Sequence, residues 1–218
     1  MTLDNYIYEI KELLPDHHKH LTNRLIKRWI DSTRNIWIKN EFNKSGVISD
    51  SFRQSIFINI EPSDQSIIST IPTKHRILKS TSKLPKMLYF GKTDGVLSVR
   101  NARVISEKYN YVTREQAVYC GNGKLNTKDI FVFLHDDYMY IKLLRDNPRI
   151  QMLDHLVVDC YIENPEDASA YTDLDNSSCF NILKQDYPIS DTLWAYMKDD
   201  ILKNGSLAIQ SNINEDER

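Results

Sequence analysis

Residues 117–143 read AVYCGNGKLNTKDIFVFLHDDYMYIKL and contain two candidate hairpin turns close together. The first is Asn122-Gly123, which is the strongest short-range hairpin signal because both central residues of the favoured turn need a positive φ. Further along, two runs of β-branched and aromatic residues, Ile130–Leu134 and Tyr138–Leu143, are separated by the polar turn His135-Asp136-Asp137. This stretch therefore predicts a β-meander in the middle of the chain.

Short segments of strand-like composition lie on both sides of this meander. Ser51–Ile60 alternates apolar and polar residues, as a half-buried strand does. Asp94-Gly95 predicts a turn between two further segments. The remaining candidate strands are His75–Leu78, Lys86–Phe90, Val96–Val99, Val104–Ser106 and Met152–Glu163. Strands this frequent, separated by turns, favour an antiparallel sandwich or a small barrel over a parallel βαβ sheet.

The N-terminal end of the chain predicts two helices. Thr2–Leu14 has one apolar face, Thr2 is a plausible N-cap, and Pro15 ends the element. The longest helical pattern runs from Asp16, which can cap it, to about Asn43, and Gly46 is its C-terminal signal. A helix of that length spans roughly 40 Å, which suits a scaffold element or a helix that faces the axis of an assembly.

The C-terminal end predicts one more helix. Ser190 is its expected N-cap, the apolar periodicity continues to about Lys203, and Gly205 is expected to end it. The sequence thus predicts an α+β protein in which residues 1–48 and 186–218 form a helical bundle from both chain ends. Residues 49–185 then form an inserted antiparallel β-sandwich or barrel-like domain, with a long acidic connector at 164–187.

Composition limits the possible classes of protein. The 218 residues include 41% hydrophobic and 27% charged residues, as expected for a folded globular chain of one large or two small domains. A formal charge of −2 argues against a dedicated nucleic-acid coat protein. The three widely spaced cysteines favour free thiols in a reducing compartment. We expect no secretion signal and no membrane span.

The predicted helix at residues 16–44 is basic on its polar side. Its seven cations stand against only Asp16, Asp31 and Glu41, which leaves a surplus of four positive charges. This pattern is typical of a solvated helix face, or else of a surface that faces a polyanion such as DNA or an acidic partner. No base-reading motif accompanies it, so a DNA contact would be independent of sequence. The candidate contact residues are Lys19, Arg24, Lys27, Arg28, Arg34 and Lys39.

Two further segments are candidate contact surfaces between subunits. The connector 164–187 has five acidic residues and one lysine, and loops of this length in compact domains are usually functional or disordered. The polar stretch 62–72 contains three isoleucines, which would be unfavourable if exposed in a monomer and natural at an interface. The candidate residues are Ile67, Ile68, Ile71, Glu166, Asp167, Asp173 and Asp175.

The sequence carries no recognisable catalytic or metal site. His17 and His20 have helical ligand spacing, but no carboxylate or cysteine near them in sequence completes a site. Residues 135–137 resemble an acidic metal turn, yet a strand reversal needs the same residue types. Residues 121–124, Gly-Asn-Gly-Lys, are too short for a phosphate-binding loop. We therefore predict no cofactor and no metal, and a hydrolase with its site at 135–137 is the least favoured hypothesis.

Several phrases resemble one protein family. They are residues 76–86 (RILKSTSKLPK), the strand pair in residues 99–106, residues 117–126 (AVYCGNGKLN), residues 138–142 (YMYIK) and residues 186–198 (DYPISDTLWAYMK). Together they resemble the head-to-tail connector or adaptor proteins of short-tailed phages, and in particular the ring proteins of crAss-like phages, akin to podoviral tail tubular adaptors.

The resemblance implies a structural virion protein of the neck or tail, assembled in the bacterial host cytoplasm. It implies helices from both chain ends around an inserted β-domain, and a ring of probably twelve copies below the portal protein. Such a ring would extend the DNA channel, touch the genome only transiently, and dock other neck and tail ring proteins. No catalysis, cofactor or membrane is implied. The alternative from the residues alone is a non-enzymatic nucleic-acid-binding module that uses the basic helix 16–44.

Overall fold

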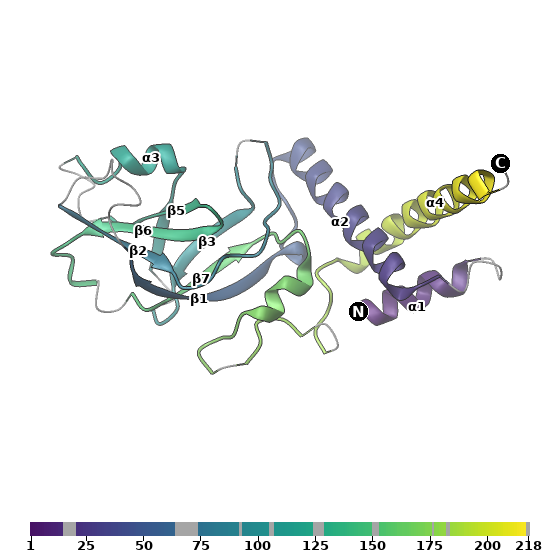
Figure 1. Ribbon diagram of the computed structural model, residues 1–218, viewed down its shortest axis with the longest axis horizontal. Helices are drawn as coiled ribbons and strands as arrows, with labels where there is room; N and C mark the ends of the chain where they lie inside the picture. The colour runs from purple at the N-terminus through teal and green to yellow at the C-terminus, as the bar shows by residue number, and fades with distance from the viewer. Residues whose placement is uncertain are drawn as a thin grey trace. The chain divides into compact units, whose positions relative to one another are not determined.

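The computed structural model describes residues 1–14, 21–63, 74–91, 93–104, 107–123, 129–149, 153–175, 177–181 and 184–216 (Figure 1). The chain divides into two compact units. The helical unit comprises Met1–Arg53, Glu163–Glu166 and Phe180–Arg218, and the barrel unit comprises Gln54–Ile162 and Asp167–Cys179. The fold class is α+β, as predicted.

Seven strands close into a barrel in the order β1-β2-β6-β5-β4-β3-β7. The domain is therefore a closed barrel and not a two-sheet sandwich, which was the other predicted alternative. All pairs are antiparallel except β4 with β5, which is parallel and so corrects the prediction of a purely antiparallel domain. The strands are β1 (Gln54–Pro62), β2 (His75–Ser80), β3 (Val96–Asn101), β4 (Lys108–Tyr111), β5 (Phe131–His135), β6 (Tyr138–Leu144) and β7 (His155–Cys160).

The barrel core is formed by one face of each paired strand. Ile56 of β1 and Val99 of β3 both lie opposite Val158 of β7, and Val132 of β5 lies opposite Ile141 of β6. All five side chains are fully buried. Burying apolar side chains of this size is worth about 1.5–3 kcal/mol each. Strand alternation therefore sets both the register and the inward face.

The second predicted turn of the 117–143 stretch is confirmed. β5 and β6 pair from His135↔Tyr138 to Phe131↔Lys142, and Asp136 and Asp137 between them have φ of 51° and 66°. Two consecutive residues with positive φ make a type I′ turn, whose twist matches that of the flanking strands. The acidic pair is thus explained by strand reversal.

The predicted hairpin at Asn122-Gly123 is wrong. Residues up to Tyr119 belong to a short helix, α3 (Arg114–Tyr119), which carries a complete capping box between Thr113 and Gln116. Gly121 follows with φ of 75°. The capping box satisfies backbone N–H groups that a strand would have paired with a neighbour, so the local signal for a helix prevails.

Buried polar groups hold the C-terminal end of α3 against the barrel. Lys142 of β6 is fully buried, and its Nζ donates to the carbonyls of Ala117 (2.7 Å), Val118 (3.2 Å) and Cys120 (2.7 Å). Burial lowers the pKa of Lys142. The helix leaves its last carbonyls without intrahelical partners, and the ammonium group supplies those partners.

Gly95 has a different role from the one predicted. The chain reverses upstream of it, where the N–H of Phe90 donates to the carbonyl of Thr93 at 3.0 Å. Gly91 there has φ of 80°. A Cβ at Gly95 would lie 2.8 Å from the carbonyl oxygen of Leu88. Glycine is needed at position 95 because two backbones approach closely, and not for a turn.

Three longer helices belong to the helical unit: α1 (Leu3–Leu13), α2 (Asn23–Ser45) and α4 (Asp191–Asp216). Gly46 ends α2 in the left-handed region, with its N–H bonded to the carbonyl of Phe42 at 2.8 Å, as predicted. Thr22 caps the start of α2 through the N–H of Leu25. The expected cap Asp16, like Pro15, lies outside the described residues.

The ends of the last helix are partly as predicted. Ser190 accepts the N–H of Leu193 at 3.3 Å, which confirms it as the N-cap. The prediction that Gly205 ends the helix is wrong, because α4 continues through Gly205 to Asp216. A single glycine costs about 1 kcal/mol inside a helix, and helix-forming neighbours can offset that cost.

The first and last of these helices touch within the helical unit. The Tyr6 ring of α1 lies 4.2 Å from the Trp194 ring of α4, centroid to centroid. Glu9 accepts from the Trp194 indole N–H at 2.7 Å and from Lys198 at 2.8 Å. The hydrogen bond from Lys198 is the main cause that lowers the pKa of Glu9. α1 and α4, from opposite ends of the chain, therefore share a core and a polar edge.

Candidate assembly surfaces

One of the predicted basic contact residues, Arg34, is not on the surface. Its side chain is fully buried, and its guanidinium donates to the carbonyls of Pro188 (3.0 Å) and Phe52 (3.2 Å). Burial lowers its pKa. Arg34 is spaced four residues from both Ile30 and Ile38, so it occupies the buried stripe of α2. Because its side chain is buried, Arg34 cannot contact a polyanion as predicted.

Arg34 and Asn35 together hold the segments at which the chain enters and leaves the helical unit. Phe52 precedes the barrel strands, and Glu163, whose carbonyl accepts the Asn35 amide at 2.9 Å, follows them. Pro188 precedes α4. Two consecutive side chains of α2 therefore hold three of the segments that lead to the barrel unit or to α4.

Lys27 is paired within the chain. It forms an ion pair with Glu166 of the acidic connector and lies 3.9 Å from Asp31. Tyr187 donates its hydroxyl to Asp31, whose pKa burial raises. This cluster joins the basic helix to the acidic connector by opposite charges. Lys27 and Glu166 are therefore engaged with each other.

Three of the four remaining cations of α2 form an exposed row, which we call the basic stripe: Arg24, Arg28 and Lys39. Spacings of four and eleven residues keep these side chains on one face of a helix. Within the described part of the chain, none of the three has an ion-pair partner. Lys19, the other predicted contact, lies outside the described residues.

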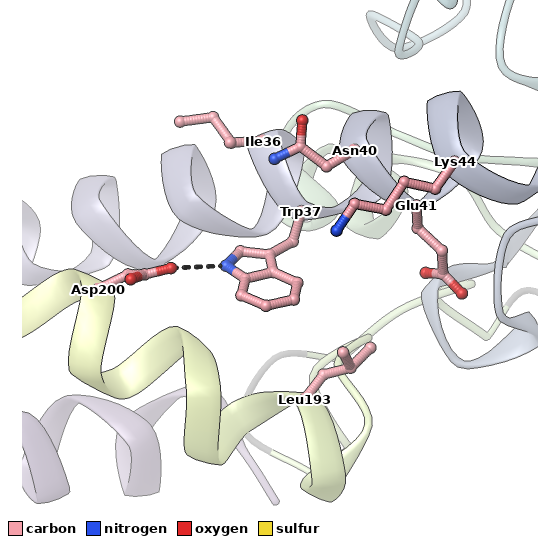
Figure 2. A pocket seen from close by; sticks show the side chains of 7 residues that line it. All are labelled: Ile36, Trp37, Asn40, Glu41, Lys44, Leu193 and Asp200. Carbon is pink, nitrogen blue, oxygen red and sulfur yellow. Dashed lines mark hydrogen bonds between the residues drawn. The ribbon is translucent and has the colours of Figure 1, made fainter.

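A groove lies beside this stripe, between α2 and α4 (Figure 2). It has a volume of about 450 Å³. Figure 2 shows the Trp37 indole between the two helices, with its N–H bonded to Asp200 at 3.0 Å. The Tyr196 ring stacks on Trp37 at 6.2 Å and is 65% exposed. The groove is lined by Ile36, Trp37, Asn40, Glu41, Lys44, Leu193 and Asp200.

The groove leaves apolar surface uncovered. Ile36 at its edge is 54% exposed, although it lies on a helix whose other isoleucines are fully buried. The groove was not predicted from the sequence. The available signal was Ile36 itself, an apolar residue three positions from Lys39 and beside the basic stripe on the helix.

The predicted acidic contacts lie in the segment that follows β7. Pro165–Ala170 form a 3₁₀ helix, in which Asp167 is exposed. A small hairpin follows, in which Thr172 bridges Ser178. It carries Asp173 and Asp175. The isoleucines at 67, 68 and 71 lie outside the described residues.

Among the described residues, no group of three or more His, Cys, Asp or Glu side chains could hold a metal ion. His17 and His20 lie outside those residues. His135 Nδ1 is 3.4 Å from Asp136 in the confirmed type I′ turn. Within the same part of the chain, no helix is both long and apolar enough to cross a bilayer.

Comparison with known proteins identifies the family. No curated protein matches the chain. A family model described as phage tail ring protein 2, of crAss-like phages, matches residues 5–218, which is nearly the whole chain and includes both units. The chain therefore belongs to the phage tail ring protein 2 family of crAss-like phages.

Proposed function

We propose that copies of this chain form a closed ring in the head-to-tail connector of the virion, below the portal protein. The observation that carries the proposal is the family match over residues 5–218. The ring of twelve copies extends the DNA channel and docks the tail. The helices from both chain ends form its supporting bundle, with the barrel domain inserted between residues 48 and 186.

The charge distribution supports contacts between copies. A closed ring needs heterologous contacts, in which one surface of each subunit meets a different surface of the next. The basic stripe offers three unpaired cations, and Asp167, Asp173 and Asp175 offer acidic groups on the other unit. Surfaces of opposite charge guide neighbouring copies into register.

The experiment is a measurement of assembled mass. The purified chain should sediment as a species of about twelve times its 25.6 kDa mass, alone or when portal complexes are added. Electron microscopy of the same sample should show rings. A chain that stays monomeric and associates with no neck or tail component would contradict the proposal.

A second candidate function is duplex binding by the isolated chain. It rests on the same basic stripe, whose cations can contact phosphates without reading bases. Salt-dependent DNA binding by a monomer that never forms rings would favour this candidate over the ring.

A further inference from the structure

The chain contains two Asn-Gly pairs, at 122–123 and at 204–205, and the structure gives them different backbones. Asn122 is exposed and follows α3 in a segment that is neither helix nor strand. The second pair lies inside α4, which continues beyond it to Asp216. The same dipeptide therefore occurs once in a loop and once in a regular helix, so the effect of the fold on its chemistry can be compared directly.

An asparagine that precedes glycine can lose its side-chain amide without an enzyme. The backbone nitrogen of the glycine gives its proton to a solvent base, attacks Cγ of the asparagine and forms a new N–Cγ bond. The Cγ–Nδ2 bond then breaks, and Nδ2 takes a proton from solvent and leaves as ammonia. Water opens the resulting imide ring at either carbonyl, which gives aspartate or isoaspartate. Glycine favours the attack because it has no Cβ to hinder the approach.

The backbone decides whether this ring can close. The attack requires the chain to turn until the glycine nitrogen faces Cγ of the asparagine. Within α4 the backbone dihedrals are helical, and each N–H donates to the carbonyl four residues earlier. Ring closure at Asn204 therefore requires the helix to open locally. The peptide between Asn122 and Gly123 belongs to no helix or strand, so ring closure there does not have to break one.

The Asn122 side chain lies at the end of α3, beside a buried cation. Its Nδ2 donates to the carbonyl of Val118 at 3.1 Å, and Lys142 Nζ donates to the same oxygen at 3.2 Å. Among the described residues, Lys142 has no ion-pair partner. Loss of Nδ2 removes one donor to Val118, and the carboxylate that replaces the amide brings a negative charge next to the ammonium group. Opposite charges at close range favour the charged form of both groups.

We propose that Asn122 is a site of spontaneous deamidation in the folded protein, whereas Asn204 is protected by the helical backbone of α4. The modified chain carries one more negative charge at the end of α3, beside Lys142. This modification site is independent of the proposed ring, because it depends only on the backbone and the neighbours of Asn122 within one chain.

Peptide mapping by mass spectrometry measures the two sites in one sample. During incubation of the folded chain at neutral pH, deamidation should be at least about tenfold faster at Asn122 than at Asn204, because the second site must wait for the helix to open. In the chain unfolded with guanidinium the two rates should become similar, since both asparagines precede glycine. Equal rates in the folded chain, or a faster rate at Asn204, would overturn the proposal.

Two variants test the chemistry at this site. Gly123→Ala places a methyl group beside the attacking nitrogen, so it should slow deamidation at Asn122 and leave the rate at Asn204 unchanged. Asn122→Gln should abolish the modification, because glutamine would have to close a larger ring. The wild-type product should include isoaspartate, which arises only when the imide opens. A product without isoaspartate, or an unchanged rate in Gly123→Ala, would overturn ring closure at Asn122.

Discussion

At the scale of single residues, Arg34 shows how one cation can organise a helical unit. It lies in the buried stripe of α2 with Ile30 and Ile38, and donates to carbonyls before the barrel and before α4. Those carbonyls would be left buried without donors if the side chain were removed. A buried acceptor that loses its partner costs about 1–3 kcal/mol.

Arg34→Leu should therefore lower the free energy of unfolding by about 2–4 kcal/mol, because two carbonyls lose their donors. The matched control is Arg28→Leu, an exposed arginine on the same helix, which should change stability by no more than about 0.5 kcal/mol. Urea denaturation of both variants measures the difference. Equal stability of the two variants would contradict the structural role of Arg34.

The sequence separates these two arginines only through helical spacing. Arg24, Arg28 and Arg34 have the same chemistry, but only Arg34 is four residues from isoleucines on both sides that are themselves buried. Residue type alone placed all of them in one basic surface. The partners of Arg34 are 18 and 154 positions away in sequence, so no local pattern could identify them.

At the scale of elements, α3 depends on a buried ammonium group. Lys142→Met should destabilise the barrel by about 2–4 kcal/mol, because three carbonyls at the end of α3 lose their donor. Lys108→Met is the control, since Lys108 is exposed on β4. Hydrogen exchange should also speed up in 114–121. Unchanged exchange there would show that α3 does not need Lys142.

The turn between β5 and β6 is a second element whose residues are fixed by backbone conformation. Asp137 has φ of 66°, a region that costs a residue with a Cβ roughly 1–2 kcal/mol unless its side chain bonds locally. Asp137→Ala should therefore lose about 1 kcal/mol, while Asp137→Gly should be neutral or stabilising. Thermal unfolding measures both. Loss of a hydrolytic activity in Asp137→Gly, with stability unchanged, would instead favour the enzyme hypothesis.

These elements show which parts of the fold could be predicted from the sequence and which could not. The β5–β6 turn and the cap at Gly46 were predictable because each depends on residues next to each other in sequence. The turn residues Asp136 and Asp137 adopt positive φ angles, and Gly46 adopts the left-handed conformation that ends α2. α3 was misread because Asn122-Gly123 is a hairpin signal only when strands flank it. The groove at Trp37 was not predictable, since it arises from the packing of helices about 160 residues apart in sequence.

At the scale of the whole molecule, the three cations of the basic stripe should contribute only weak binding to DNA. The basic stripe supplies three exposed cations. Each phosphate contact contributes about −0.9 to the slope of log K against log salt concentration. The stripe should therefore contribute no more than about −3 to the slope for duplex binding by each copy. Weak contacts of this kind would suit the proposed DNA channel, because tight phosphate binding would hinder the passage of a genome.

Binding of a labelled duplex across a range of salt concentrations tests this expectation. Random and fixed sequences should bind alike, because the stripe contacts no base edges. Arg24→Gln with Arg28→Gln should flatten the slope by about 2, and Asp146→Asn should leave it unchanged. An unchanged slope in Arg24→Gln with Arg28→Gln would contradict DNA contact through the stripe, and a strong sequence preference would favour a dedicated DNA-binding module.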